Sequence, residues 1–365
     1  MGEGLFAVRR WSAKGRGSLA WLAMLGVAMA GGARLVGQED APIHTLHVYT
    51  NLIQVPALVL SRQRGPMPLV AEWRFRLNLD AGPWFRPTHV RLEGDDPITL
   101  ALLLDNRGTQ ADLMQGVGHA IGGLAPQYLH ANDHVSIYGL ECKLMRATEE
   151  SGTTPEVLQH GVELVLRAEH GDVQKKGKKE CGRRTSLVDS LVMMTSQLQG
   201  RPGRKVILAV TDGKDQGGVR TWKEMTKYAQ GQGVAIFVIS ESVDDFSRMR
   251  PRFGGFEDAM RAASELSGGI VMTTDRRGLA DQLRGFTRMV RGRYILEFPR
   301  ARNSTAGEHA IAVKIEKSDA FIRMAGVSVA LPDAKEMSDP TTIRNDESQA
   351  PEMGARRPLP ASGPK

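Results

Sequence analysis

Ile98 to Asp105 reads ITLALLLD, an apolar run that is interrupted only by Thr99 and ends in an aspartate. Such a continuous run is typical of a strand that is buried on both faces of a parallel sheet. Lys205 to Val210 (KVILAV) and Val234 to Ile239 (VAIFVI) repeat the pattern. Helical patterns separate these strands, at residues 109–123, 155–168, 185–198, 219–230, 256–266 and 279–290. Strands that alternate with helices in this way predict an α/β fold with a doubly wound, mostly parallel sheet.

The segments on either side of this α/β domain have β patterns. We predict an α/β domain over residues 98–298, an N-terminal β element over 43–96 and a C-terminal β element over 299–332. Residues 333–365 are rich in Pro, Ser, Asp and Glu and have almost no bulky apolar side chains. Such a composition predicts a disordered tail.

The first 30 residues have the pattern of a signal peptide rather than of a folded element. Four basic residues precede the apolar run Leu19–Ala30, which is shorter than a segment that spans ~30 Å of hydrocarbon. Ala28-Met29-Ala30 supplies a small-x-small cleavage site. We therefore expect a secreted, periplasmic or cell-envelope protein, with membrane attachment only if the segment stays uncleaved.

Charge and composition exclude some classes of partner. The formal net charge is +7, and three of these units lie in the signal segment. Only 5% of the residues are aromatic, and no basic stripe is interleaved with aromatic side chains. We therefore expect no nucleic-acid binding.

Two cysteines, Cys142 and Cys181, form a possible disulfide in an oxidising exported compartment. Spacing alone leaves open whether their Cα atoms approach to within ~6 Å. Arg183 and Arg184 belong to a basic run close to Cys181. Such a run is either a solvated loop or the rim of an anion site.

Two of the predicted strands end in an aspartate, at Asp105 and at Asp212. Ligands of open α/β sheets bind beyond the carboxyl ends of the strands. Between the two aspartates, Thr185 lies at the start of a predicted helix. Carboxylates and hydroxyls that converge on one face favour a hard divalent cation such as Mg²⁺.

At these residues the sequence resembles the von Willebrand factor A domain, which implies a Rossmann-like sheet. The residues that flank the domain, 50–56 and 293–296, resemble an acidobacterial exported subfamily of such proteins. The family's metal-ion-dependent adhesion site is made by a D-x-S-x-S loop, a threonine and an aspartate. The resemblance places Asp105 and Thr109 on the first loop, Thr185 on the second and Asp212 on the third.

Arg107 departs from this pattern, because it occupies the place of the first serine. A guanidinium carries a fixed charge and has no lone pair to offer a metal. We favour a site in which Arg107 replaces the metal and bridges Asp105 and Asp212. Two alternatives stay open: a weakened metal site with Arg107 turned outward, and a pair of aspartates that only caps structural elements.

The sequence lacks the motifs of hydrolases, zinc proteases and nucleotide-binding loops, so we expect no enzymatic activity. The resemblance implies a module for protein binding or cell adhesion, with a protein partner in the envelope or the extracellular space. Its adhesion site is degenerate, so we expect either no cofactor or weakly bound Mg²⁺. The alternative is a structural envelope scaffold whose flanking β units make the contacts and whose metal face is vestigial.

Overall fold

The computed structural model describes residues 52–107, 111–148, 152–173, 186–201, 203–215, 217–241, 256–301, 307–325, 328–329 and 350–354. The predicted signal peptide therefore lies outside the described residues. The chain from Leu46 onward forms one compact unit. No helix in the described ranges is both long and apolar enough to cross a bilayer.

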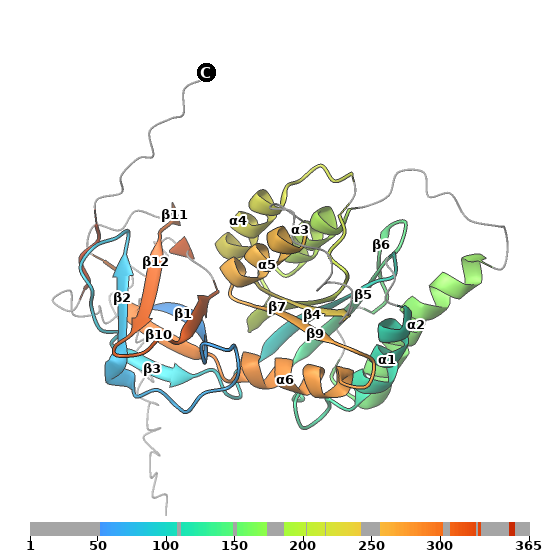
Figure 1. The fold of residues 1–365 in the computed structure, drawn as a ribbon, viewed down its shortest axis with the longest axis horizontal. Coiled ribbons are helices and arrows are strands. Elements are labelled where there is room, and N and C mark those ends of the chain that lie inside the picture. Colours follow the sequence, from blue (N-terminus) through green and yellow to red (C-terminus); the bar gives the residue numbers. More distant parts are fainter. Residues whose placement is uncertain are drawn as a thin grey trace, which may run out of the picture. The chain divides into compact units, whose positions relative to one another are not determined.

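A six-stranded sheet lies at the centre of the α/β domain (Figure 1). In spatial order its strands are β6 (Leu144–Arg146), β5 (His134–Leu140), β4 (Ile98–Asp105), β7 (Arg204–Val210), β8 (Ala235–Glu241) and β9 (Val271–Thr274). Every pair is parallel except β5 with the short edge strand β6. The predicted doubly wound, mostly parallel sheet is confirmed.

Six helices in the described part of the domain cover the sheet. They are α1 (Ala111–Gly122), α2 (Pro155–Val173), α3 (Leu187–Gln197), α4 (Trp222–Gln232), α5 (Phe256–Ser267) and α6 (Leu279–Arg291). Figure 1 shows α3, α4 and α5 on one face of the sheet and α1, α2 and α6 on the other.

The alternation of side chains along β4 explains why its sequence is apolar throughout. Leu100, Leu102 and Leu104 pack with helices α1, α2 and α6, whereas Ala101 and Leu103 pack with α3, α4 and α5. All eight residues of the strand are buried. A strand with helices on both faces has no solvated side, so it keeps no polar alternation.

The two β elements that flank this domain in sequence form one structure, which we call the β module. One sheet of the module has the order β13-β1-β10-β3, and a second pairs β12 with β2. The strands are β1 (Leu52–Leu60), β2 (Phe75–Leu79), β3 (His89–Leu92), β10 (Tyr294–Pro299), β12 (Ile311–Ile315) and β13 (Phe321–Met324). A shared apolar core from both chain segments holds the sheets together, so the α/β domain is an insertion between the two halves of the module.

Two predicted boundaries differ from this arrangement. The sequence pattern predicts that residues 294–298 end the α/β domain, but β10 pairs with β1 and β3 of the β module. Within the tail that was predicted to be disordered, Pro351 is buried and the Gly354 amide donates to the Leu79 carbonyl at 3.0 Å. These contacts follow from strand pairing and close backbone approach over long sequence separations, which leave no local pattern.

Candidate functional site at the carboxyl ends of β4 and β7

The loops after β4 and β7 meet because these strands are parallel neighbours, with Leu104 opposite Val210. Asp105 is the last residue of β4, and Thr211 and Asp212 follow β7 directly. The structure therefore brings the two predicted aspartates to one edge of the sheet. We call the described residues at this edge the Asp105 face; they are Asp105, Arg107, Thr211, Asp212, Lys214 and Asp215.

Asp105 is buried, and its carboxylate is bound from two sides. Arg107 donates from Nε to Oδ1 at 2.8 Å and from Nη2 to Oδ2 at 2.9 Å, a bidentate pair. The Arg107 backbone amide also donates to Oδ1 at 3.2 Å, and the Thr211 hydroxyl donates to Oδ2 at 2.7 Å. Both oxygens therefore accept short hydrogen bonds, two of them from a fixed cation.

Arg107 stays charged in this position. Burial by itself would lower the pKa of its guanidinium, but the hydrogen bonds and attraction to Asp105 raise it, and Asp215 and Asp212 add to the rise. The net result is a pKa above the ordinary value of arginine. Its side chain is 14% exposed, so the charge is held mostly inside the loop.

Asp212 is bound by a different cation. The Lys214 amide donates to its Oδ1 at 3.0 Å, and Lys214 Nζ lies 3.0 Å from its Oδ2. Arg107 instead donates from Nη2 to the Lys214 carbonyl at 3.3 Å. The guanidinium therefore pairs with Asp105 as expected, whereas the expected bridge to Asp212 is replaced by a local pair within the third loop.

Gly213 permits that turn. Its φ is +76°, and a Cβ at this position would come within 2.6 Å of the Met260 sulfur. Glycine adopts this conformation at little cost, whereas a larger residue would be strained at this φ and would displace the Met260 side chain. The turn places Lys214 over Asp212, two residues away.

Asp215 and Asp189 fix the neighbouring helix. The Asp215 carboxylate accepts from the amides of Leu187, at 2.7 Å, and Val188, at 3.3 Å, in the first turn of α3. Ser186 is the N-cap of α3 and accepts from the Asp189 amide at 2.9 Å. The sequence predicts a helix over residues 185–198, close to this start, but its pattern alone does not identify the Ser186 cap or the contact of Asp215.

The Asp189 carboxylate in turn orders the loop before α4. It accepts from the amides of Val219 and Arg220, each at 3.0 Å. Burial pushes the pKa of Asp189 upward, but the amides of Val219 and Arg220 and the Ser186 hydroxyl outweigh it, so the pKa is lowered. Asp189 is therefore a structural carboxylate that is ionised at neutral pH.

Structural comparison finds solved structures to which this chain is similar at low identity. A von Willebrand factor type A structure from Catenulispora acidiphila has 12% identity and a TM-score of 0.38, and the match covers 72% of this chain and 74% of that one. An aerotolerance-related membrane protein from Bacteroides fragilis has 13% identity and a TM-score of 0.38, over 53% of this chain and 98% of that one. Proximal thread matrix protein 1 from the mussel byssus, solved with a zinc-occupied MIDAS motif, has 14% identity and a TM-score of 0.37, over 55% and 49%.

No family model and no curated protein matches the sequence. The sheet order, the helices on both faces and the aspartates that follow β4 and β7 agree with the resemblance found in the sequence. The α/β part therefore has the doubly wound fold that the resemblance to von Willebrand factor A domains implies. At such low identities the likeness concerns the fold alone, and the chemistry of the site follows from the residues of this chain.

The described residues of the α/β domain do not fit a divalent cation at Asp105. A metal there would have to displace the guanidinium from both carboxylate oxygens, or lie beside a fixed positive charge that repels it. Thr109, Thr185, Arg183 and Arg184 lie outside the described residues, so their places in the site stay predictions. Cys142 is disulfide-bonded, but Cys181 also lies outside the described residues.

Proposed function

We propose that this chain is an exported, non-enzymatic protein-binding module whose Asp105 face works with Arg107 in place of a divalent cation. The bidentate pair between Arg107 and Asp105 carries the proposal, because the internal cation neutralises the carboxylate that would otherwise hold a metal. The apolar segment near the N-terminus supports export to the periplasm, the cell envelope or the extracellular space.

The bonding of the carboxylates favours binding over catalysis. Asp105 is bound by Arg107 and Thr211, and Asp212 is bound by Lys214. Asp189 and Asp215 each accept hydrogen bonds from backbone amides. A general base needs a carboxylate that can take a proton from a substrate, and here every described carboxylate of the face has a structural partner.

Lys214 is the part of the face that a partner can reach. Its side chain is 63% exposed, whereas those of Asp212 and Arg107 are 11% and 14% exposed. In the sites that the sequence resembles, an acidic side chain of the partner completes the coordination of the metal. We infer that an acidic partner side chain pairs with Lys214 here, without a metal.

Metal titration tests the role of Arg107. We expect isothermal titration calorimetry to detect little binding of Mg²⁺ or Mn²⁺ to the wild type and to detect clear binding to Arg107→Ser, which gives the loop a second hydroxyl. Arg107→Lys is the matched control, since it keeps a positive charge and should not gain metal binding. Stoichiometric Mg²⁺ binding by the wild type would contradict the proposal.

Partner capture tests the binding face. We expect immobilised wild type to retain a protein from envelope extract equally well with and without EDTA, and Lys214→Glu to lose that protein. Lys223→Glu changes the same charge on an exposed position of α4 and should retain it. Loss of the protein on addition of EDTA would show instead that a metal takes part.

The scaffold alternative is favoured by one observation in the β module. Trp73 and Trp84 are 61% and 43% exposed, and the Lys314 Nζ lies 4.0 Å from the centroid of the Trp84 ring. Large exposed aromatic side chains are common at the centres of protein interfaces. If Lys214→Glu retains the captured protein and Trp73→Ser loses it, the β module makes the contact and the scaffold is the better description.

A further inference from the structure

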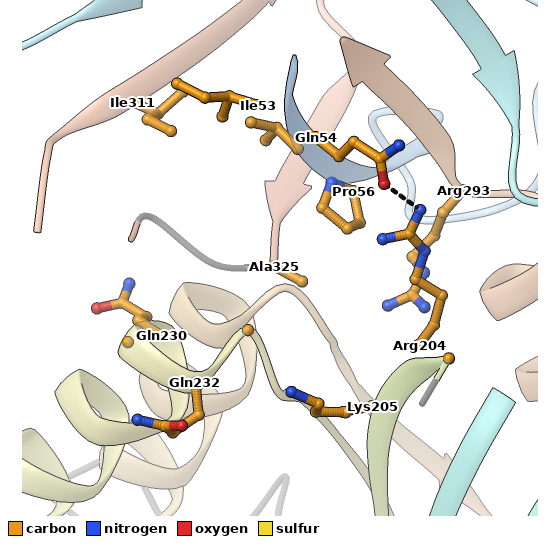
Figure 2. Close-up of a pocket in the computed structure, with 14 residues that line it drawn as sticks. Ile53, Gln54, Pro56, Arg204, Lys205, Gln230, Gln232, Arg293, Ile311 and Ala325 are labelled. Carbon is orange, nitrogen blue, oxygen red and sulfur yellow. Dashed lines mark hydrogen bonds between the residues drawn. The ribbon is translucent and has the colours of Figure 1, made fainter. Parts of the chain in front are cut away.

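A cavity of about 300 Å³ lies at the opposite end of the sheet from the Asp105 face. Strand β7 begins there at Arg204, which is paired with Ile98 at the start of β4. The other walls come from β1, from the end of α4, from Ile311 at the start of β12 and from Ala325 just after β13 (Figure 2). The cavity therefore lies where the β module meets the α/β domain, inside one compact unit.

The charged side chains that line the cavity are all basic. They are Arg204, Lys205 and Arg293, and the lining contains no Asp or Glu. The Arg293 guanidinium is already paired with a carboxylate: its Nε and Nη2 donate to the two oxygens of Glu93 at 2.6 and 2.9 Å. Both of these side chains are buried, so Arg293 contributes a fixed and fully paired charge.

Arg204 is only partly compensated. Its Nη2 donates to the Gln54 side-chain oxygen at 2.9 Å, as Figure 2 shows. The carboxylates of Glu93 and Asp96 lie 3.6 and 3.7 Å away, beyond hydrogen-bond distance. Burial lowers its pKa and the attraction of these two carboxylates does not restore it, so the pKa lies below the ordinary value.

The charged side chains in and next to the cavity include one more cation than anions. Glu93, Asp96 and Glu297 face three guanidiniums, which belong to Arg91, Arg204 and Arg293. Lys205 is additional, and its ammonium has no hydrogen-bond or ion-pair partner in the structure that is described. A single negative charge inside the cavity would therefore balance this group of residues.

The rest of the lining has an apolar side and an amide side. Ile53, Pro56 and Ile311 come from the β module, whereas Gln230 and Gln232 come from α4. Figure 2 shows Lys205 and Gln232 across the cavity from Ile53 and Pro56. A ligand of small size with one charged end and one aliphatic end matches this division.

We propose that the cavity binds a monocarboxylate with a short aliphatic group, whose carboxylate pairs with Lys205 and Arg204 and whose aliphatic end packs on Ile53, Pro56 and Ile311. Two sources supply this chemistry: a free short-chain carboxylic acid, and the C-terminal residue of a peptide. The site is separate from the Asp105 face and does not depend on the function proposed for that face.

Isovalerate and acetyl-alanyl-leucine are the probes, tested by calorimetry and by ligand-observed saturation-transfer NMR on the full chain. We expect both carboxylates to bind, and we expect isovaleramide and the C-terminal amide of the peptide not to bind. Tighter binding of the peptide than of isovalerate would identify a peptide C-terminus as the source, and equal or weaker binding would identify a free acid.

Two variants address the charge of the site. Lys205→Gln removes the unpaired ammonium and Gln232→Glu adds a repelling carboxylate, so each should weaken binding by about tenfold or more. Lys223→Gln on α4 should leave the affinity unchanged, and thermal unfolding should show that all three variants are folded. Absence of binding by the wild type, equal binding of the uncharged amides, or unchanged affinity in both folded site variants would overturn the proposal.

Discussion

The two ends of the strand pair β4–β7 hold bidentate arginine–carboxylate pairs that differ in origin and in surroundings. At the amino end, Arg293 binds Glu93 across 200 positions of the sequence, and the exposed fractions of the two side chains are 1% and 0%. At the carboxyl end, Arg107 binds Asp105 across two positions, and Arg107 keeps an edge towards solvent.

The comparison shows how one type of ion pair serves two purposes. The pair at the amino end joins the two chain crossings between the β module and the α/β domain, because Glu93 follows β3 and Arg293 precedes β10. Neither partner has water as an alternative, so removal of one of the two charges leaves the other buried without a counter-charge. The pair at the carboxyl end closes one loop, and a different cation could take the place of Arg107.

Removal of the Glu93 carboxylate should give the largest effect. Glu93→Gln leaves the buried guanidinium of Arg293 without a counter-charge and removes the nearest compensation of Arg204, so the free energy of unfolding should fall by about 3–5 kcal/mol. Urea unfolding followed by circular dichroism measures the change. Glu72→Gln, at an exposed site, is the control.

The double variant Glu93→Leu/Arg293→Met sharpens this test. Replacing both charges by apolar side chains removes the unpaired ion, so much of the lost stability should return. If Glu93→Gln lowers the free energy of unfolding by less than about 1 kcal/mol, the Glu93–Arg293 pair does not stabilise the junction between the β module and the α/β domain.

Removal of the Arg107 guanidinium should give a smaller loss that a metal can reverse. Without divalent cations, Arg107→Ser should lose about 1–3 kcal/mol, because Asp105 keeps only the Thr211 hydroxyl and one backbone amide. Millimolar Mg²⁺ should raise the melting temperature of this variant and not that of the wild type. If Arg107→Ser is destabilised and Mg²⁺ does not raise its melting temperature, then restoring this one serine is not enough to make a metal site at the Asp105 face.

Asp189 provides an intermediate effect with a defined pH dependence. Its pKa is lowered in the folded chain, so its contribution is present above its unfolded pKa of about 4 and disappears as the pH falls through the lower folded pKa. Asp189→Asn should therefore lose about 1 kcal/mol at neutral pH and converge with the wild type in acid.

Urea unfolding of the wild type and of Asp189→Asn at several pH values between neutral and acid measures this convergence. Asp319→Asn, at a site where the side chain is 78% exposed, should show no such pH-dependent difference. A constant difference between wild type and Asp189→Asn at all pH values would show that the charge of Asp189 does not matter.

The fold was predictable where the signal is local. The apolar run in β4 predicts a strand covered on both faces, and the helices between the strands predict parallel connections. The β module was not predicted as one structure, because β1 pairs with β10 across more than two hundred positions. Its strands have ordinary β patterns, and nothing in either segment identifies the partner strand.

The candidate site shows the same limit. The lack of a lone pair on Arg107 argues against metal ligation by this residue, and in the structure its guanidinium is paired with Asp105. The local turn at Gly213 brings Lys214 against Asp212. This turn depends on a positive φ at Gly213, which a single glycine in the sequence indicates only weakly. The sequence does not identify Glu93 as a structural residue. A glutamate that follows a strand is usually solvated, and its pairing with Arg293, 200 residues away, leaves no local pattern.

Lys214 should give the smallest change in stability, and for that reason it separates binding from folding. Its ammonium is well exposed, and Asp212 keeps the Lys214 backbone amide as a donor when the side chain is removed. Lys214→Gln should therefore change the free energy of unfolding by at most about 0.5–1 kcal/mol, and less at high salt. If the free energy of unfolding of this variant instead falls by several kcal/mol, the fold depends on the ion pair of Lys214 as strongly as on the Glu93–Arg293 pair. If it unfolds like the wild type while partner capture falls, the two ion pairs differ as proposed: the Glu93–Arg293 pair serves the fold, and the face that contains Arg107 and Lys214 serves recognition.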